Sequence, residues 1–118
     1  MRIPRRGEIW FVQLPTDPPD KGLRPVVIVS LDARNRNAQA NTVLVVPLST
    51  SVHLASSPTH TLLPAGETGL QADSIARAQD ITIVRKDALV EPRSQLRFVS
   101  DTRICELAQK VKIAMDCQ

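Results

Sequence analysis

The sequence predicts a mainly β fold, in which a small, strongly curved antiparallel sheet or barrel is closed by one C-terminal helix. Short runs of β-branched residues, separated by turn-forming residues, recur along the first 84 positions. The spacing of apolar residues then becomes helical near the C-terminus. A chain of 118 residues supports one hydrophobic core. We therefore expect residues 1–118 to form a single domain of two packed layers.

The first half of the chain carries the segments expected at the centre of the sheet. Residues 7–14 (GEIWFVQL) mix β-formers with polar residues in partial alternation, which predicts a strand. Residues 15–22 (PTDPPDKG) contain three prolines and a glycine, and these predict a surface loop. Residues 25–30 (PVVIVS) and 42–48 (TVLVVPL) are continuous apolar runs rich in valine. Both predict buried strands in the middle of the sheet.

The second half adds shorter strands. Residues 31–41 are polar and are expected to connect the two central strands. Residues 59–63 predict a strand, residues 64–69 a turn with two glycines, and residues 74–84 two further extended pieces. Residues 86–98 show no assignable pattern.

The end of the chain predicts a helix. Its apolar residues recur at helical spacing, at Ile104, Leu107, Ala108, Val111 and Met115. Ser100 or Asp101 is expected to cap the helix N-terminus with a side-chain oxygen.

Composition restricts the classes of function. A formal net charge of +3 and a pI of about 9.3 suit a polyanionic partner. Aromatic residues make up only 3% of the chain, which disfavours a protein that holds nucleic acid by stacking bases on aromatic side chains. The two cysteines form neither a disulfide framework nor a zinc-binding pattern. We expect no metal and no cofactor.

The same composition indicates a cytoplasmic protein. The longest apolar runs are far shorter than the roughly 20 residues that a membrane-spanning helix needs. The basic N-terminus is not followed by an apolar segment with a cleavage site, so it does not resemble a signal peptide.

Two places in the sequence offer groups for phosphate chemistry. Arg24 precedes Pro25, which favours extended backbone and so directs the guanidinium, a planar group with five donors. We expect Arg24 at the mouth of the barrel with its side chain in solvent, where it either binds phosphate or is an ordinary surface arginine. Pro47 predicts an edge or bulge just before Ser49 and Thr50. Those hydroxyls either bond a phosphate or a ribose 2′-OH, or cap a turn.

Four segments together resemble the MazF/PemK toxins in order and spacing. They are GEIWFVQL at 7–14, GLRPVVIVS at 22–30, VLVVPLSTS at 43–51 and GLQADSIARAQDITIV at 69–84. The Gly-x-Arg-Pro-Val block and the valine-rich strand that ends in Pro-x-Ser are specific in combination. The C-terminal helix matches only in type.

The resemblance implies an SH3-like barrel of the PemK/CcdB type with a C-terminal helix. It implies a homodimeric, metal-independent, sequence-specific endoribonuclease that acts on single-stranded RNA, leaves 2′,3′-cyclic phosphate and 5′-OH ends, and is neutralised by an acidic antitoxin. By position, the catalytic residues are Arg24 with Ser49, where Thr50 could substitute. The RNA-binding candidates are Asp20, Lys21, Arg77 and Gln79. The general base is not identified.

Two alternatives share this fold. A CcdB-like toxin would inhibit DNA gyrase by binding, without catalysis, but the pair of Arg24 and Ser49 favours the nuclease branch. An SH3-like interaction module is disfavoured because such grooves are lined by aromatic residues.

Overall fold

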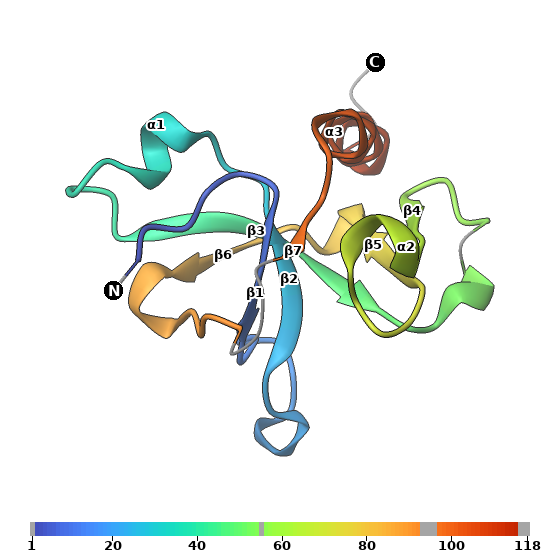
Figure 1. Ribbon diagram of the computed structural model, residues 1–118, viewed down its shortest axis with the longest axis horizontal. Coiled ribbons are helices and arrows are strands. Elements are labelled where there is room, and N and C mark those ends of the chain that lie inside the picture. Colours follow the sequence, from blue (N-terminus) through green and yellow to red (C-terminus); the bar gives the residue numbers. More distant parts are fainter. Residues whose placement is uncertain (1, 55, 93–96, 116–118) are drawn as a thin grey trace.

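The chain folds into a strongly curled antiparallel sheet with a long helix against one side (Figure 1). The computed structural model describes residues 2–54, 56–92 and 97–115. Its strands are β1 (Glu8–Val12), β2 (Arg24–Ile28), β3 (Thr42–Ser49), β4 (His60–Leu63), β5 (Ser74–Arg77), β6 (Thr82–Arg85) and β7 (Arg97–Phe98). Within the described residues these strands form one sheet in the order β4-β5-β3-β2-β1-β7, and β6 pairs with β3. The predicted fold class and the central position of β2 and β3 are confirmed.

The helices are α1 (Asp32–Asn35), α2 (Ala65–Thr68) and α3 (Asp101–Met115), and short 3₁₀ turns lie at η1 (Pro19–Lys21), η2 (Val52–Leu54), η3 (Ala78–Asp80) and η4 (Lys86–Ala88). The C-terminal helix is confirmed, and Ser100 Oγ caps it by accepting a hydrogen bond from the Arg103 amide at 3.3 Å. None of the described helices is long and apolar enough to cross a membrane.

The single turn of α1 forms where the sequence predicts only a connection. Its last residue, Asn35, is buried, and Asn35 Oδ1 accepts a hydrogen bond from the Ser30 hydroxyl at 2.6 Å. The side-chain nitrogen of Asn35, Nδ2, donates to the Ser30 carbonyl at 3.0 Å. These tertiary contacts stabilise a turn that local sequence does not reveal.

Strand β3 is the centre of the sheet because three strands pair with it. One edge pairs with β2, from Val45 to Pro47. The other edge pairs first with β6, from Thr42 to Val45, and then with β5, at Leu48 and Ser49. Pro47 lies between these two segments, so its missing N–H coincides with the change of partner. The predicted irregularity at Pro47 is therefore a junction inside the strand.

Apolar side chains cover both faces of the curled sheet. The cluster between the sheet and α3 contains Ile9, Val27, Val46, Leu48, Leu63, Ala76, Val99, Ile104 and Leu107. The cluster on the other face contains Trp10, Val12, Leu14, Val26, Ile28, Val43, Val45, Val84 and Leu89. Because both faces are buried, polar side chains that could bind a ligand gather at the ends of the strands and in the loops.

Two contacts fix the start of α3. Arg103 donates to both carboxylate oxygens of Glu67 in α2 at 2.9 Å, and this hydrogen-bonded ion pair lowers the pKa of Glu67. The carbonyl of Gly7, just before β1, accepts a hydrogen bond from the Val99 amide at 2.7 Å. Gly7 has φ 92°, and a Cβ added there would lie 2.8 Å from the Val99 carbonyl oxygen. The close approach of these two chain segments therefore requires glycine.

We expect Gly7→Ala to lower the free energy of unfolding by about 2 kcal/mol or more, from left-handed backbone strain together with the clash against Val99. Gly66→Ala is the matched control, since a Cβ at Gly66 meets nothing within 4 Å. Its effect should be small, or stabilising by up to about 1 kcal/mol. Urea denaturation of both variants measures the difference in their free energies of unfolding. Equal stabilities would contradict the requirement for glycine at position 7.

Candidate functional site

Sheet register brings Arg24 and Ser49 to the same face. Val26 of β2 is paired with Pro47 of β3, so their side chains point the same way. Arg24 lies two residues before Val26, and Ser49 two residues after Pro47. Side chains two positions apart on a strand share a face, so the guanidinium and the hydroxyl project from neighbouring strands on one side.

Arg24 is held by two acceptors. Its Nη2 donates to the Leu48 carbonyl at 3.0 Å, and its Nη1 lies 3.4 Å from the carboxylate of Asp17 in the loop before η1. The side chains of Arg24 and Asp17 are only 16% and 12% exposed. The expectation that Arg24 extends into solvent is therefore wrong, because the loop folds back over the start of β2.

Arg24 and Ser49 line a pocket of about 320 Å³ at the junction of β2, β3 and β5. Its lining comprises Lys21, Arg24, Pro25, Leu48, Ser49, Thr50, Ser51 and Ser74. The pocket thus joins two cationic side chains to four hydroxyls. Of the residues predicted for the site, Arg24, Ser49, Thr50 and Lys21 lie together here.

The two candidate hydroxyls differ in their surroundings. Ser49 is half-buried, and its Oγ accepts a hydrogen bond from the Ser51 amide at 3.2 Å, which leaves the hydroxyl proton available for a ligand. Thr50 is exposed and follows the last residue of β3. Ser49 both shares a sheet face with Arg24 and caps the turn, so the two roles considered for it are compatible.

Three of the predicted RNA-binding residues lie outside the lining of this pocket. Asp20 is exposed on η1. Arg77 is at the end of β5, two residues after Ile75, the partner of Ser49. It therefore shares the sheet face of Ser49, and its Nε lies 3.1 Å from Asp80 Oδ2.

Gln79, on η3, belongs to a neighbouring polar group. Its Oε1 accepts a hydrogen bond from the Thr59 hydroxyl at 2.9 Å, and its Nε2 lies 2.9 Å from Nε2 of His60. His60 is the cross-strand partner of Arg77. Arg77 on β5, His60 on β4 and Gln79 on η3 thus form a polar group at the β5 end of β3.

Sequence reasoning did not identify Asp17 or Ser74 as site residues. Asp17 is one of two carboxylates in the loop at 15–22, and no spacing rule indicates which one folds back onto Arg24. Ser74 is buried at the start of β5, and its hydroxyl donates to the Ala72 carbonyl at 3.4 Å. Only the pairing of β5 with the end of β3 brings it to the pocket.

This arrangement suits a tetrahedral or five-coordinate oxyanion. A fixed guanidinium beside a lysine favours negative charge, and the hydroxyls both donate and accept hydrogen bonds. Among residues 2–54, 56–92 and 97–115, no three His, Cys, Asp or Glu side chains gather as a metal site requires.

Comparisons with known proteins agree with this geometry. Residues 5–115 match the family described as PemK-like, MazF-like toxin of type II toxin-antitoxin system. Endoribonuclease MazF9 of Mycobacterium tuberculosis (strain ATCC 25618 / H37Rv) is 33% identical over 120 residues, which cover 95% of this chain and 96% of the relative.

Solved structures share the fold. Mycobacterium tuberculosis toxin MazF-mt6 superposes with a TM-score of 0.73 at 21% identity, covering 94% of this chain and 98% of the other. An endoribonuclease in complex with its cognate antitoxin, from a mycobacterial species, gives a TM-score of 0.70 at 24% identity, covering 100% and 98% of the two chains.

The family match spans nearly all of the chain, from residue 5 to residue 115. The chain belongs to the PemK-like, MazF-like toxins of type II toxin-antitoxin systems.

Proposed function

We propose that residues 1–118 act as one toxin domain, a cytoplasmic, sequence-specific endoribonuclease that cleaves single-stranded RNA without a metal ion. The observation that carries this proposal is the convergence of Arg24 and Ser49 on one pocket, in a chain of this family. A relative that is 33% identical is named an endoribonuclease.

The proposed reaction is an internal transfer of the phosphodiester. The ribose 2′-oxygen loses its proton to a base and bonds to the adjacent phosphorus. A five-coordinate phosphorane forms, and the bond from phosphorus to the 5′-oxygen then breaks. The leaving oxygen takes up a proton, so the products are a 2′,3′-cyclic phosphate and a 5′-hydroxyl.

Arg24 would stabilise the negative charge that develops on the phosphorane. Its side chain is already fixed by Leu48 and Asp17, so little reorganisation is needed when the substrate binds. Arginine side chains keep their proton at neutral pH, which makes Arg24 an unsuitable proton donor. Asp17 is a positioning residue, because its carboxylate contacts the guanidinium and is absent from the pocket lining.

We assign the Ser49 hydroxyl as the one that contacts the substrate. It shares a sheet face with Arg24, and its proton is free to donate to a phosphate oxygen or to the 2′-oxygen. Thr50, Ser74 and Lys21 line the same pocket and would hold the flanking phosphate or ribose. Asp20, Arg77 and Gln79 would contact the nucleotides on either side.

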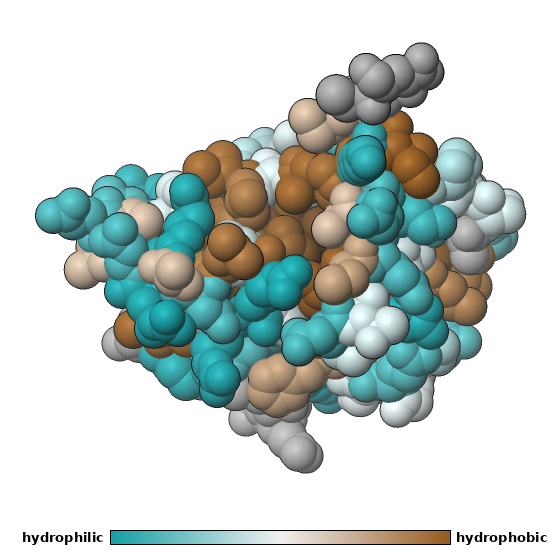
Figure 2. Space-filling model, turned by 90° about the horizontal axis from the view of Figure 1, so that it is seen from above, coloured by the Kyte–Doolittle hydropathy of each residue, from teal (hydrophilic) through white to brown (hydrophobic). Residues whose placement is uncertain are grey.

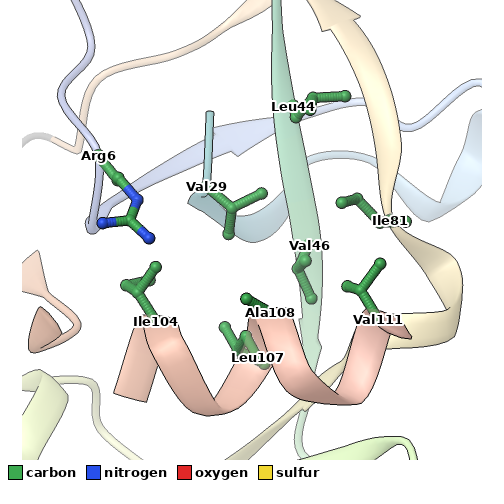
Figure 3. A pocket seen from close by; sticks show the side chains of 9 residues that line it. All are labelled: Arg6, Val29, Leu44, Val46, Ile81, Ile104, Leu107, Ala108 and Val111. Carbon is green, nitrogen blue, oxygen red and sulfur yellow. The ribbon is translucent and has the colours of Figure 1, made fainter. Parts of the chain in front are cut away.

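We further propose a homodimer, formed through an apolar groove beside α3. The groove has a volume of about 190 Å³ and is lined by Arg6, Val29, Leu44, Val46, Ile81, Ile104, Leu107, Ala108 and Val111 (Figure 3). Figure 2 shows apolar side chains gathered on this side of the molecule. Met115 continues this apolar face along α3 and is 74% exposed. So much exposed apolar surface is typical of an interface.

An acidic antitoxin is the proposed regulatory partner. The chain carries a net charge of +3, and the Arg24 pocket holds two cationic side chains, which would attract carboxylates as they attract phosphates. A solved relative of the same fold is in complex with its cognate antitoxin.

Incubating the purified protein with a long single-stranded RNA in excess EDTA tests the proposed reaction. We expect cleavage to persist and to leave 5′-hydroxyl and 2′,3′-cyclic phosphate ends, which end-specific ligation and sequencing identify. A strict Mg²⁺ requirement with 5′-phosphate products would overturn the mechanism. Loss of gyrase supercoiling activity without RNA cleavage would support the binding-only alternative.

A double-mutant cycle separates the roles of Arg24 and Asp17. Arg24→Ala should slow cleavage about 100- to 1,000-fold, the loss expected for a donor to an oxyanion. It should also destabilise the fold by about 1–3 kcal/mol, since it leaves the Asp17 carboxylate without its partner. Asp17→Asn should lower kcat about tenfold with little change in KM, because Arg24 is less well held.

In the doubly substituted protein, Asp17→Asn should add almost nothing to the loss from Arg24→Ala, because Asp17 acts through Arg24. Arg24→Lys keeps the charge and should recover only part of the rate. Independent, multiplicative losses from the two positions would mean that Asp17 acts directly on the substrate.

Placing a charge in the groove should break the dimer. We expect Ala108→Glu to give a monomer by analytical ultracentrifugation, because its carboxylate would be buried against apolar side chains. Gln109→Glu, one residue further along α3 and exposed, is the matched control and should remain dimeric. A monomeric unmodified protein at micromolar concentration would contradict this interface.

A further inference from the structure

A second pocket lies at the opposite end of β3 from the Arg24 site. It has a volume of about 380 Å³ and is walled by the connection after α1 and by the turn after β6. Lys86 joins the two walls, since its amide donates to the Asn41 carbonyl at 2.8 Å and its Nζ to the Asn37 carbonyl at 3.0 Å. The pocket is therefore built from two segments that are far apart in the sequence.

The charges around this pocket are mainly positive. Arg36, Arg85 and Lys86 line it with a single carboxylate, that of Asp87. Asp87 accepts two hydrogen bonds from Arg85, at 3.0 and 2.8 Å, which lower the pKa of Asp87. Among the described residues Arg36 has neither a hydrogen-bond nor an ion-pair partner for its guanidinium, and it is exposed. One anion could therefore reach Arg36 and the unused donors of Lys86 together.

The pocket lining favours a phosphate over an acidic peptide. A peptide with apolar anchors needs an apolar wall, whereas Ile3 is the single large apolar side chain among the lining residues of this pocket. The side-chain amide of Asn41 adds a further donor. Arginine, lysine and amide groups are the usual contacts to the phosphates of a nucleic acid.

The distance to the Arg24 site fits a continuous RNA strand. Thr42 and Ser49 bound β3, so the two pockets are separated by seven residue steps, or about 23 Å. Figure 1 shows the β6 and α1 end of β3 and its β5 end on opposite sides of the molecule. A single strand that keeps the 3.4 Å spacing of stacked bases covers that distance in about seven nucleotides.

We propose that the pocket of Arg36, Arg85 and Lys86 binds a backbone phosphate of the RNA substrate, about seven nucleotides from the scissile bond. This inference rests on the proposed function, since it names a second contact for the same substrate. The pocket would strengthen binding of long RNA without reading its sequence.

The test uses two fluorescein-labelled RNAs centred on a mapped cut site, each with the 2′-hydroxyl at that site replaced by hydrogen. One is about 15 nucleotides long and reaches the pocket in either direction, and the other is about 4 nucleotides long and does not. Affinity is measured by anisotropy from 50 to 400 mM KCl for the unmodified protein, Arg36→Gln and Arg36→Gln/Lys86→Gln. Lys110→Gln on α3 is the charge-matched control.

We expect Arg36→Gln to weaken binding of the long RNA about fivefold at 0.1 M salt and to reduce the slope of log K against log salt by about 0.7, the value for one phosphate. The double substitution should weaken binding further, but its slope should stay about 0.7 below that of the unmodified protein, because both cations contact the same phosphate. Binding of the short RNA should not change, nor should cleavage of a short RNA that keeps its 2′-hydroxyl, and Lys110→Gln should affect neither. Arg36→Gln alone keeps the test valid if loss of the Lys86 contacts unfolds the double variant.

Equal salt slopes for the unmodified protein and Arg36→Gln would overturn the proposal, as would equal losses for the long and short RNAs. Weaker binding of an acidic antitoxin with unchanged RNA binding would instead assign the pocket to a protein partner. If the unmodified protein cuts no RNA, no cut site can be mapped and the proposed activity fails. The salt slopes of the unmodified protein and Arg36→Gln on a long uncut single strand then test the pocket by itself.

Discussion

The change of partner along β3 is the constraint on which the rest of the structure depends. Strands β2 and β3 are paired from Ile28 opposite Val45 to Val26 opposite Pro47. The pairing stops there, because the end of β3 turns to pair with β5. The Leu48 carbonyl just beyond the ladder receives its hydrogen bond from the Arg24 side chain. The Arg24 side chain therefore takes the place of a main-chain donor beyond the end of the ladder. The pocket forms where the two strands diverge, and its principal cation is fixed by the same divergence.

Fixing an arginine in this way has an energetic consequence for both stability and catalysis. Arg24 and Asp17 are each largely buried, so removing either one leaves the other without its oppositely charged partner in a poorly solvated place. The same low exposure strengthens the attraction between the guanidinium and a phosphate that enters the pocket. Asp17 also offsets part of the positive charge in the absence of RNA. The site is therefore held ready without a large net repulsion between Arg24 and Lys21.

Much of this arrangement can be predicted from the sequence by local rules. The β-branched runs predict strands, the helical spacing after Ser100 predicts the helix, and the Arg-Pro block predicts extended backbone at Arg24. The same rules could not place Arg24 in its buried position, because that depends on how the proline-rich loop returns over β2. They also missed Asp17, Ser74 and α1, whose positions depend on how the loops fold against the strands. The sequence predicts Asp20 as an RNA-binding residue. In the structure Asp20 is exposed and does not line the pocket. Strand identity is encoded locally, whereas loop closure is a tertiary property.

Successive side chains of β3 point to opposite faces, so the proposed dimer groove and the Arg24 pocket lie on different faces of the strand. Leu44 and Val46 line the apolar groove beside α3, whereas Val45, on the alternate face, packs in the core beneath Trp10. Ser49 continues the face of Val45 and so points away from the groove. A second copy seated on the groove would therefore leave the Arg24 pocket open, and one strand can serve both surfaces because its successive side chains face opposite ways. A bulge that shifted this register by one residue would exchange the two faces and abolish both.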